Sequence, residues 1–260
     1  TLAAISASGS EKLLKGFKPA VDGFDQVPFE DLDAVKEAIS PQTGGILIEP
    51  ILGEGGVKPV SEEFLHALRE LCDAEGLLLM FDEIQCGAGR TGKFYAHEWS
   101  GVTPDIMSSA KGIGNGFPVG VCLANDEAAK GMKPGSHGST YGSNPLALAV
   151  CHAVLDVILE EGFFQHVVDM GDYLQQEVVT LADKYPHVVK GVRGKGLMQG
   201  MLLEAPNTEI LQALRKHRLL TAPASDNVIR LLPPLIITKD HVDEAIGIMT
   251  TVCEEYSASS

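Results

Sequence analysis

Hydrophobic and polar residues follow two spacings in this chain, one typical of buried strands and one typical of amphipathic helices. Continuous apolar runs occur at Gly45–Glu49 and Leu77–Asp82, and each ends abruptly at an acid. Strand, helix and strand in this order predict a right-handed parallel unit that delivers both acids to one sheet edge. The predicted helix between the runs begins at Ser61 as N-cap, and its apolar stripe comprises Phe64, Leu65, Leu68, Leu71 and Cys72.

The region before Gly45 has weaker patterns. Thr1–Gly23 is rich in Gly, Ser and Lys and shows little periodicity, so we expect a surface excursion that precedes the first regular element. Pro28–Ser40 has apolar residues at helical spacing and acids near its start, where the helix dipole favours negative charge. A short helix is therefore predicted there.

After Asp82 the pattern is interrupted. Gly87–Pro104 contains four glycines and little periodicity, which predicts a long ordered loop. Two short strands, Asp105–Ser109 and Pro118–Ala124, are predicted next. A helix then runs over Asn144–Glu160, and apolar residues surround most of its circumference, so we expect it to be buried between domains.

From Phe163 onward the elements are shorter and alternate in type. This pattern predicts a smaller α/β layer domain that follows a domain boundary at the preceding helix. The predicted elements are a helix around Val167–Leu181, strands at Val188–Val192 and Leu197–Leu203, a helix around Ile210–Leu214, a strand at Val228–Leu232 and a last helix around Val242–Cys253.

Composition narrows the class of protein. The 260 residues carry a net charge of -15, which argues against nucleic acid or an anionic membrane as a partner. Five widely spaced cysteines without a Cys-x-x-Cys pair favour a reduced, cytoplasmic protein over a disulfide or zinc framework. The most apolar stretch, Leu146–Leu159, is too short to span a bilayer and is interrupted by His152 and Asp156. We therefore expect a soluble protein without a metal.

Asp82 and Lys111 carry the candidate chemistry. Asp82 lies at the carboxyl end of a predicted buried strand, where open α/β sheets place their ligands, and Lys111 follows the next predicted strand between small residues. An ionised acid beside a pyridine nitrogen and a neutral lysine that condenses with an aldehyde suit pyridoxal phosphate chemistry. Spacing alone supports equally an alternative in which Asp82 caps a turn and Lys111 is solvated.

Five motifs together separate these alternatives. They resemble the class III aminotransferases, and the similarity runs from Thr1 to the last predicted helix. The resemblance implies a fold type I, pyridoxal-phosphate-dependent transferase, with a mostly parallel sheet in a large domain (part of it 1–145), an interdomain helix (146–162) and a small carboxyl-terminal α/β domain (163–260). The motifs are EPILGEGG at 49–56, FDEIQCGAGRTG at 81–92, TPDI at 103–106, AKG at 110–112 and GSHGSTYGSNP at 135–145.

The resemblance also implies roles for single residues. Lys111 would bind the cofactor aldehyde and act as general base, Asp82 would pair with the pyridinium nitrogen, and Gln85 would lie near the phenolic oxygen. Ser139 would lie at the substrate. In these enzymes the threonine that matches Thr140 binds the cofactor phosphate of the neighbouring subunit, which implies a homodimer with shared active sites.

Glu54 lies in GEGG (53–56) and Arg230 in IRLLPP (229–234), and both segments match family positions. A guanidinium binds a carboxylate bidentately, and a movable glutamate can mask it. We therefore expect Glu54 to neutralise Arg230 while the diamine is bound and to swing away for glutamate. The alternative is two unrelated surface charges.

The overall resemblance favours transfer of the terminal amino group of N2-acetylornithine to 2-oxoglutarate, in arginine biosynthesis. Ornithine, succinylornithine and succinyldiaminopimelate are alternative substrates. Leu52, Asn115 and Ser143 depart from the common pattern beside the site. The family's phosphate loop, ring-stacking aromatic and substrate-binding arginine that precede this region cannot be matched, so a further alternative is an inactive fragment that lacks amino-terminal site elements.

Overall fold

The computed structural model describes residues 1–259, which divide into two compact units, residues 1–44 and the residues from Gly45 onward. The first unit contains α1 (Leu2–Ala7), α2 (Glu11–Leu14) and α3 (Leu32–Ala38). The expectation that no regular element precedes residue 23 is therefore wrong. Helices α1 and α2 are too short to show periodicity, whereas α3 confirms the helix predicted within Pro28–Ser40. The Ser10 side chain caps α2 by accepting from the Leu13 N–H, and the Ser6 hydroxyl of α1 accepts from the Val21 N–H at 2.9 Å.

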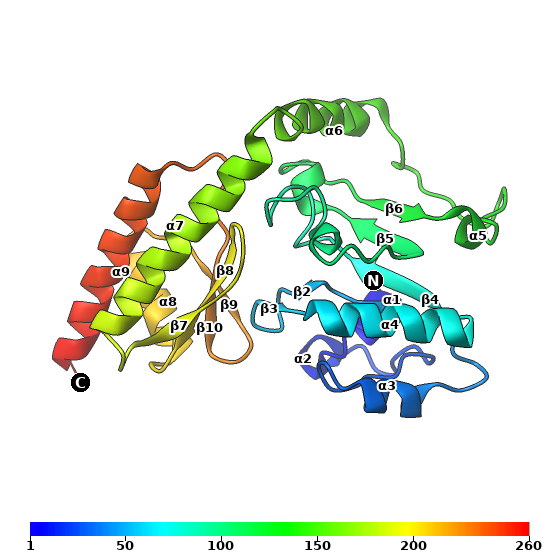
Figure 1. Cartoon of the computed structure of the whole chain (residues 1–260), viewed down its shortest axis with the longest axis horizontal. Coiled ribbons are helices and arrows are strands. Elements are labelled where there is room, and N and C mark those ends of the chain that lie inside the picture. Colours follow the sequence, from blue (N-terminus) through cyan, green and yellow to red (C-terminus); the bar gives the residue numbers. More distant parts are fainter. Residues whose placement is uncertain (260) are drawn as a thin grey trace. The chain divides into compact units, whose positions relative to one another are not determined.

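The second unit begins with a four-stranded sheet in the order β1-β4-β5-β6 (Figure 1). Strands β1, β4 and β5 are mutually parallel, and β6 pairs antiparallel with β5 at the edge. The parallel unit predicted from the apolar runs is confirmed, and so is the mostly parallel sheet that the resemblance implies. The bounds are β1 Gly45–Ile48, β4 Leu78–Asp82, β5 Ile106–Ser109 and β6 Val121–Ala124.

Helix α4 (Glu62–Glu75) connects β1 to β4, as its apolar stripe predicts. The Ser61 side chain accepts from the Phe64 N–H, and Gly76 ends the helix with φ 67°. Between β1 and α4 lies an antiparallel pair that the sequence does not reveal, β2 (Ile51–Leu52) and β3 (Lys58–Pro59). Two residues are too few to establish a period of two, so pattern analysis misses such strands.

The loop after β4 is ordered around one buried carboxylate, that of Glu83. It accepts from the N–H groups of Ala96 and His97 at 2.9 and 2.8 Å, and it contacts the His97 ring at 3.0 Å. These bonds join the two ends of the glycine-rich loop and position the short helix η1 (Ala96–Trp99). The predicted long ordered loop is confirmed. Two further short helices follow, η2 (Lys111–Ile113) and α5 (Asp126–Ala129).

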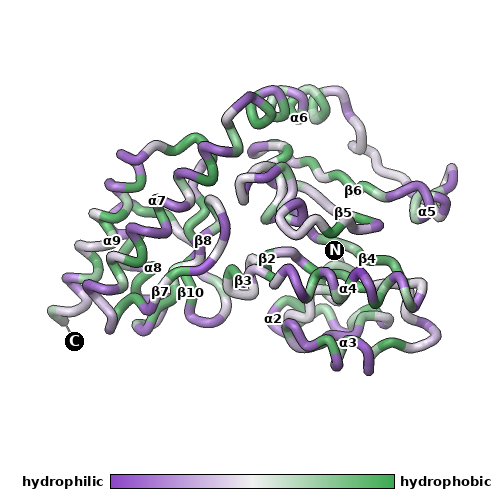
Figure 2. The backbone as a smooth tube through the Cα atoms, viewed as in Figure 1, coloured by the Kyte–Doolittle hydropathy of each residue, from purple (hydrophilic) through white to green (hydrophobic). Residues whose placement is uncertain are grey.

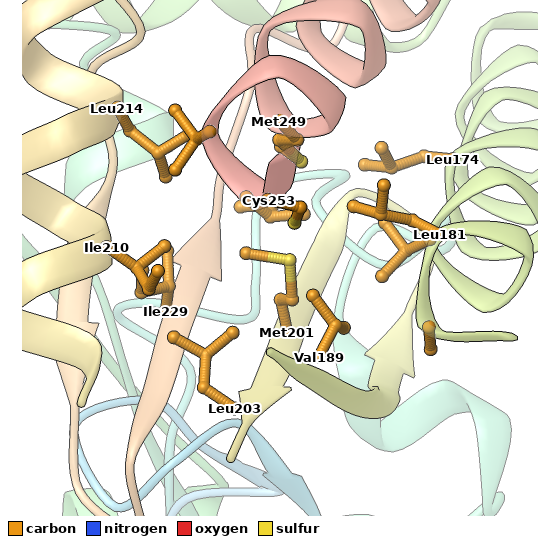
Figure 3. Packing of buried hydrophobic residues seen from close by; sticks show 14 of the residues in the cluster. Leu174, Leu181, Val189, Met201, Leu203, Ile210, Leu214, Ile229, Met249 and Cys253 are labelled. Atoms are coloured by element: carbon orange, nitrogen blue, oxygen red, sulfur yellow. The ribbon is translucent and has the colours of Figure 1, made fainter. Parts of the chain in front are cut away.

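The carboxyl-terminal part contains an antiparallel sheet in the order β7-β8-β10-β9. Three helices pack against this sheet and one another, and their apolar faces form one core with the strands (Figures 1 and 3). In Figure 3, Leu181 of α7, Leu214 of α8 and Met249 of α9 converge on Met201 of β8. The bounds are α7 Phe163–Lys184, β7 Val189–Lys195, β8 Met198–Leu203, α8 Asn207–Lys216, β9 Ala222–Ala224, β10 Val228–Leu231 and α9 Lys239–Ser259.

Helix α6 (Pro145–Ile158) differs from the expectation. Hydrophobic positions dominate this helix (Figure 2), yet only Ala147, Cys151 and Ile158 are buried. Leu146 and Val157 are exposed by 63% and 45%, so the prediction of burial around the helix is wrong for this chain. An apolar surface is buried only where another element covers it, and the other described residues cover only one side of α6. The division into domains at 145 and 162 stays a prediction.

Among residues 1–259, none of the helices is long and apolar enough to cross a membrane. The same residues contain no group of three or more His, Cys, Asp and Glu side chains that could hold a metal ion.

Candidate functional site

Asp82 and Lys111 lie at the carboxyl ends of neighbouring parallel strands. Asp82 is the last residue of β4 and is opposite Ser108 of β5. Lys111 begins η2, two residues after β5 ends at Ser109. The carboxyl edge of a parallel sheet is where open α/β folds bind their ligands. The structure thus brings the predicted acid and the predicted lysine to one edge.

The two oxygens of the Asp82 carboxylate are in different situations. Oδ1 accepts a hydrogen bond from the Ile84 N–H at 2.9 Å, which fixes the orientation of the group. Oδ2 has no hydrogen-bond partner within residues 1–259, and the residue is half-buried. A half-buried carboxylate with one oxygen anchored and one unpaired can accept a charged N–H group from a ligand.

Lys111 is held in a strained backbone conformation. Its φ of 45° lies in the left-handed region that residues with a Cβ rarely adopt. Close packing maintains this turn, because a Cβ added to the next residue, Gly112, would lie 3.0 Å from the Ala88 Cβ. Ala88 itself has φ 52°. Such strain costs about 1–3 kcal/mol per residue and is concentrated at functional sites. Lys111 is exposed, so a ligand can reach its amine.

Glu49, directly after β1, is a third acid at this edge. Burial raises the pKa of Glu49 above its ordinary value of 4.5, and the nearby charges of Asp82 and Glu54 raise it further. The Gly53 N–H, which donates to Oε2 at 3.0 Å, and the Lys111 ammonium act in the opposite direction. Glu49 therefore lies within electrostatic reach of both Asp82 and Lys111. Sequence analysis places it at the correct edge but does not assign it a role.

Arg230 of β10 connects the Glu54 loop to the loop after β4. Its Nη2 forms an ion pair with Glu54 Oε1 at 2.7 Å and donates to the Pro223 carbonyl at 3.2 Å. Its Nη1 donates to Gln85 Oε1 at 2.8 Å. The buried Nε has no partner within the described part of the chain. The predicted pairing of Glu54 with Arg230 is thus present, and Gln85 joins it.

The backbone that carries Glu54 is fixed by residues that sequence analysis does not single out. Arg193 Nε and Nη2 both donate to the Gly56 carbonyl, at 2.9 and 2.7 Å. The Ser225 N–H donates to the Glu54 carbonyl at 3.0 Å. Asp226 forms an ion pair with Lys58 at 2.5 Å. Glu54 thus has a fixed backbone and a side chain that is 78% exposed.

Ser139 and Thr140 lie on an exposed turn before α6. Ser139 Oγ accepts from the Gly142 N–H at 2.9 Å, and the Asn144 side chain donates to the Tyr141 carbonyl at 2.8 Å. No hydrogen bond or ion pair within residues 1–259 joins Ser139 or Thr140 to the other predicted site residues. The structure therefore does not bring these two hydroxyls into contact with the Asp82 edge.

These residues fit pyridoxal phosphate. Asp82 offers an unpaired carboxylate oxygen for a pyridinium N–H, and Lys111 offers an exposed amine on a strained turn at the same edge. Arg230 supplies a cation that is paired with the exposed Glu54 side chain. A lysine amine for the cofactor aldehyde and an acid for the pyridine nitrogen are groups that this cofactor takes from its protein.

The comparisons with known proteins agree with this interpretation. The family model described as "Aminotransferase class-III" matches residues 1–253. The chain is 57% identical over 247 residues to the acetylornithine aminotransferase of Mesorhizobium japonicum, covering 95% of this chain and 62% of the relative. It is 54% identical to that of Brucella melitensis, covering 100% of this chain and 64% of the relative. The chain thus spans less than two thirds of the length of these relatives.

Solved structures show the same likeness. The ornithine aminotransferase of Toxoplasma gondii matches with a TM-score of 0.93 and 30% identity, covering 100% of this chain and 63% of that one. The acetylornithine aminotransferase of Elizabethkingia anophelis matches with a TM-score of 0.82 and 36% identity, covering 90% and 60%.

Proposed function

The chain belongs to the class III aminotransferase family, and from this membership we propose that it is part of a pyridoxal-phosphate-dependent aminotransferase. The proposed reaction moves the terminal amino group of N2-acetylornithine to 2-oxoglutarate, in arginine biosynthesis. The names of relatives at 54–57% identity support this choice of substrate. The cofactor follows from the family, whose members use pyridoxal phosphate.

The observation that carries the proposal is the pair formed by Asp82 and Lys111 at the carboxyl edge of β4 and β5. When bound, pyridoxal phosphate supplies an electron sink for the substrate carbanion. The unpaired oxygen of Asp82 would accept the pyridinium N–H and keep that nitrogen protonated. Lys111 would bind the cofactor aldehyde. The substrate amine would displace Lys111 from the aldehyde, and the freed Nζ would move the proton from the substrate carbon to the cofactor side.

Glu54 and Arg230 would distinguish the two substrates by charge. Glutamate brings a carboxylate that Arg230 can bind, whereas the reacting end of the acylated diamine does not. The exposed Glu54 side chain would pair with Arg230 in the diamine half-reaction and leave it for glutamate. The 2.7 Å ion pair and the fixed backbone of Glu54 support a movement confined to the side chain.

A homodimer with shared active sites, located in the cytoplasm, completes the proposal. Thr140 would contribute to the phosphate site of the partner subunit, and Ser139 would lie near the substrate. Two features support an intersubunit role for this region: the turn 138–142 is exposed, and α6, which follows it, carries exposed apolar residues such as Leu146.

Ornithine is the second candidate substrate. The likeness to the ornithine aminotransferase of Toxoplasma gondii over the whole chain favours it. Succinylornithine and succinyldiaminopimelate share the terminal amine and need the same chemistry. Initial rates with these four amines at equal concentration would rank them, and a preference for any amine other than N2-acetylornithine would overturn the proposed substrate.

The proposed cofactor site is tested by absorbance. Purified protein incubated with pyridoxal phosphate and then desalted is expected to show a visible band, and borohydride should fix the cofactor to the peptide that contains Lys111. Lys111→Ala should lose this fixation. A protein without a visible band, or with the cofactor fixed to another lysine, would instead support the inactive fragment or a different site.

A further inference from the structure

The carboxamide of Gln85 can take only one orientation beside Arg230. A guanidinium has N–H donors and no acceptor, so the group that receives the 2.8 Å bond from Arg230 Nη1 must be the Gln85 oxygen. The amide NH2 of Gln85 therefore faces away from Arg230. This assignment follows from the chemistry of the partner, whereas the atoms of a glutamine amide are otherwise hard to distinguish.

The NH2 group is restricted from a second side by Gly53. A Cβ added to Gly53 would lie 2.0 Å from Gln85 Nε2, so the amide packs directly on the glycine backbone. Gly53 is buried, and its N–H donates to Glu49 Oε2 at 3.0 Å. Gln85 is thus held by Arg230 at its oxygen and by Gly53 at its nitrogen. Within residues 1–259 the NH2 group has no hydrogen-bond acceptor, so it can donate to a bound ligand.

Arg230 uses different nitrogens for its two tasks. Nη1 holds Gln85, whereas Nη2 contacts Glu54. The Arg230 side chain is 9% exposed and is also anchored to the Pro223 carbonyl. Departure of the exposed Glu54 side chain therefore leaves the bond from Nη1 to Gln85 in place. We expect Nη1 to keep this bond with either substrate, because Nη2 and the unpartnered Nε are the nitrogens left for a carboxylate.

We propose that Arg230 is a positioning residue for Gln85, in addition to any role in binding a substrate carboxylate. By holding the Gln85 oxygen, it directs the amide NH2 to donate to the ring oxygen of the cofactor throughout both half-reactions. The inference rests on the proposed function, because it assumes that pyridoxal phosphate binds beside Asp82. It explains why the buried Arg230 is bonded to Gln85, which lies three residues after the end of β4 at Asp82.

The test is a pH titration of the visible absorbance of the holoenzyme, without substrate. A hydrogen bond donated to the ring oxygen stabilises the negative charge of that oxygen. It therefore favours loss of the proton on the nearby nitrogen that joins Lys111 to the cofactor, and removal of the donor should raise the midpoint of this titration. Gln85→Met is expected to raise it by about 0.5–1 pH unit, the effect of one neutral hydrogen bond. Arg230→Met should also raise it, although Arg230 itself need not touch the cofactor.

A double-mutant cycle separates positioning from the loss of a positive charge. If Arg230 acts through Gln85, then Arg230→Met should have no further effect in the Gln85→Met protein. Shifts that add in the double variant, or a midpoint unchanged by Arg230→Met, would overturn the inference. Glu54→Gln is the matched control, because it removes a charge from Nη2 and leaves the bond to Gln85; its shift should be small in comparison.

Two further readouts keep the result unambiguous. Circular dichroism shows whether each variant is folded, and Arg230→Lys, which keeps the charge but loses the forked donor geometry, replaces Arg230→Met if the latter does not fold. Arg230→Lys is expected to raise the titration midpoint and to have no further effect in the Gln85→Met protein. Shifts that add in this double variant would again overturn the inference. Wild-type protein without a visible band would refute the proposed function itself, whereas a band with additive shifts would refute only the role of Arg230.

Discussion

Arg230 and Glu54 are 2.7 Å apart, yet their side chains differ sharply in exposure, 9% for the arginine and 78% for the glutamate. Water can solvate the Glu54 carboxylate when it leaves, whereas the buried Arg230 charge would then lack a partner, which is costly. Departure of Glu54 is therefore favourable only when another carboxylate takes its place beside Arg230. An asymmetric pair of this kind suits a mask that is removed when a carboxylate substrate arrives.

Glu54→Ala is expected to impair the choice between amino donors. Without Glu54, Arg230 is unmasked in both half-reactions, so kcat/KM for the acylated diamine should fall by about 3- to 10-fold, while that for glutamate should stay constant or rise. Single-turnover rates for each half-reaction measure this ratio. Glu54→Gln, which keeps the shape and an acceptor oxygen, should lie between wild type and alanine. An unchanged ratio in both variants would refute the mask.

Asp82→Asn is expected to reduce turnover by more than about 100-fold with little effect on folding. Asparagine keeps the shape and the oxygen that accepts from the Ile84 N–H, but it lacks the charge that would keep a pyridinium protonated. Steady-state rates give the first quantity, and thermal unfolding gives the second. A near-normal rate in this variant is incompatible with the assigned role, and a collapsed melting curve would indicate a structural role instead.

Glu49→Gln is expected to stabilise the protein at alkaline pH. Burial raises the pKa of Glu49 above 4.5, so above that value the folded state holds a proton that the unfolded state has lost, and stability falls as pH rises through the folded-state pKa. Glutamine avoids this cost and can still accept from the Gly53 N–H. The melting temperature of the variant should exceed that of wild type at about pH 8, and the difference should vanish below the unfolded-state value.

Glu70→Gln provides the control for this pH dependence. Glu70 is exposed on α4 and makes no hydrogen bond or ion pair within the described residues. Its substitution should give the same small change in melting temperature at both ends of the pH range. If the Glu49 variant behaves like this control, the cost of ionising Glu49 in the folded protein is negligible.

Gly171→Ala and Gly247→Ala should change stability in opposite directions, although both glycines lie in helices, α7 and α9. Alanine is preferred over glycine inside a helix by about 1 kcal/mol, and a Cβ at Gly247 would meet nothing within 4 Å. At Gly171 the Cβ would lie 2.5 Å from the Gly196 backbone. We expect Gly247→Ala to stabilise by about 0.5–1 kcal/mol and Gly171→Ala to destabilise by about 1–3 kcal/mol.

Chemical denaturation measures both values. Equal stabilisation by the two substitutions would mean that the backbones at Gly171 and Gly196 can separate at no cost. The contact is part of a close junction, since a Cβ at Gly196 would in turn lie 2.6 Å from the Thr91 backbone.

The sequence by itself determined the elements whose signals are local. The apolar run that ends at Asp82 specifies a buried parallel strand, because only such strands are apolar on both faces. Ser61 and Gly76 mark the ends of α4 through a side-chain cap and a positive φ, which depend on a few adjacent residues. Asp82 and Lys111 were identified for the same reason, since Asp82 ends one strand and Lys111 lies two residues after the next.

Only the tertiary structure decided the relations between distant segments. Gln85 and Arg230 are 145 residues apart, and no local pattern links them, because their bond depends on how β10 meets the loop after β4. Burial of Glu49 likewise depends on neighbouring elements. The apolar sequence of α6 predicted burial, but Leu146 is 63% exposed. Apolar side chains favour burial, yet they are buried only where the fold places another element against them.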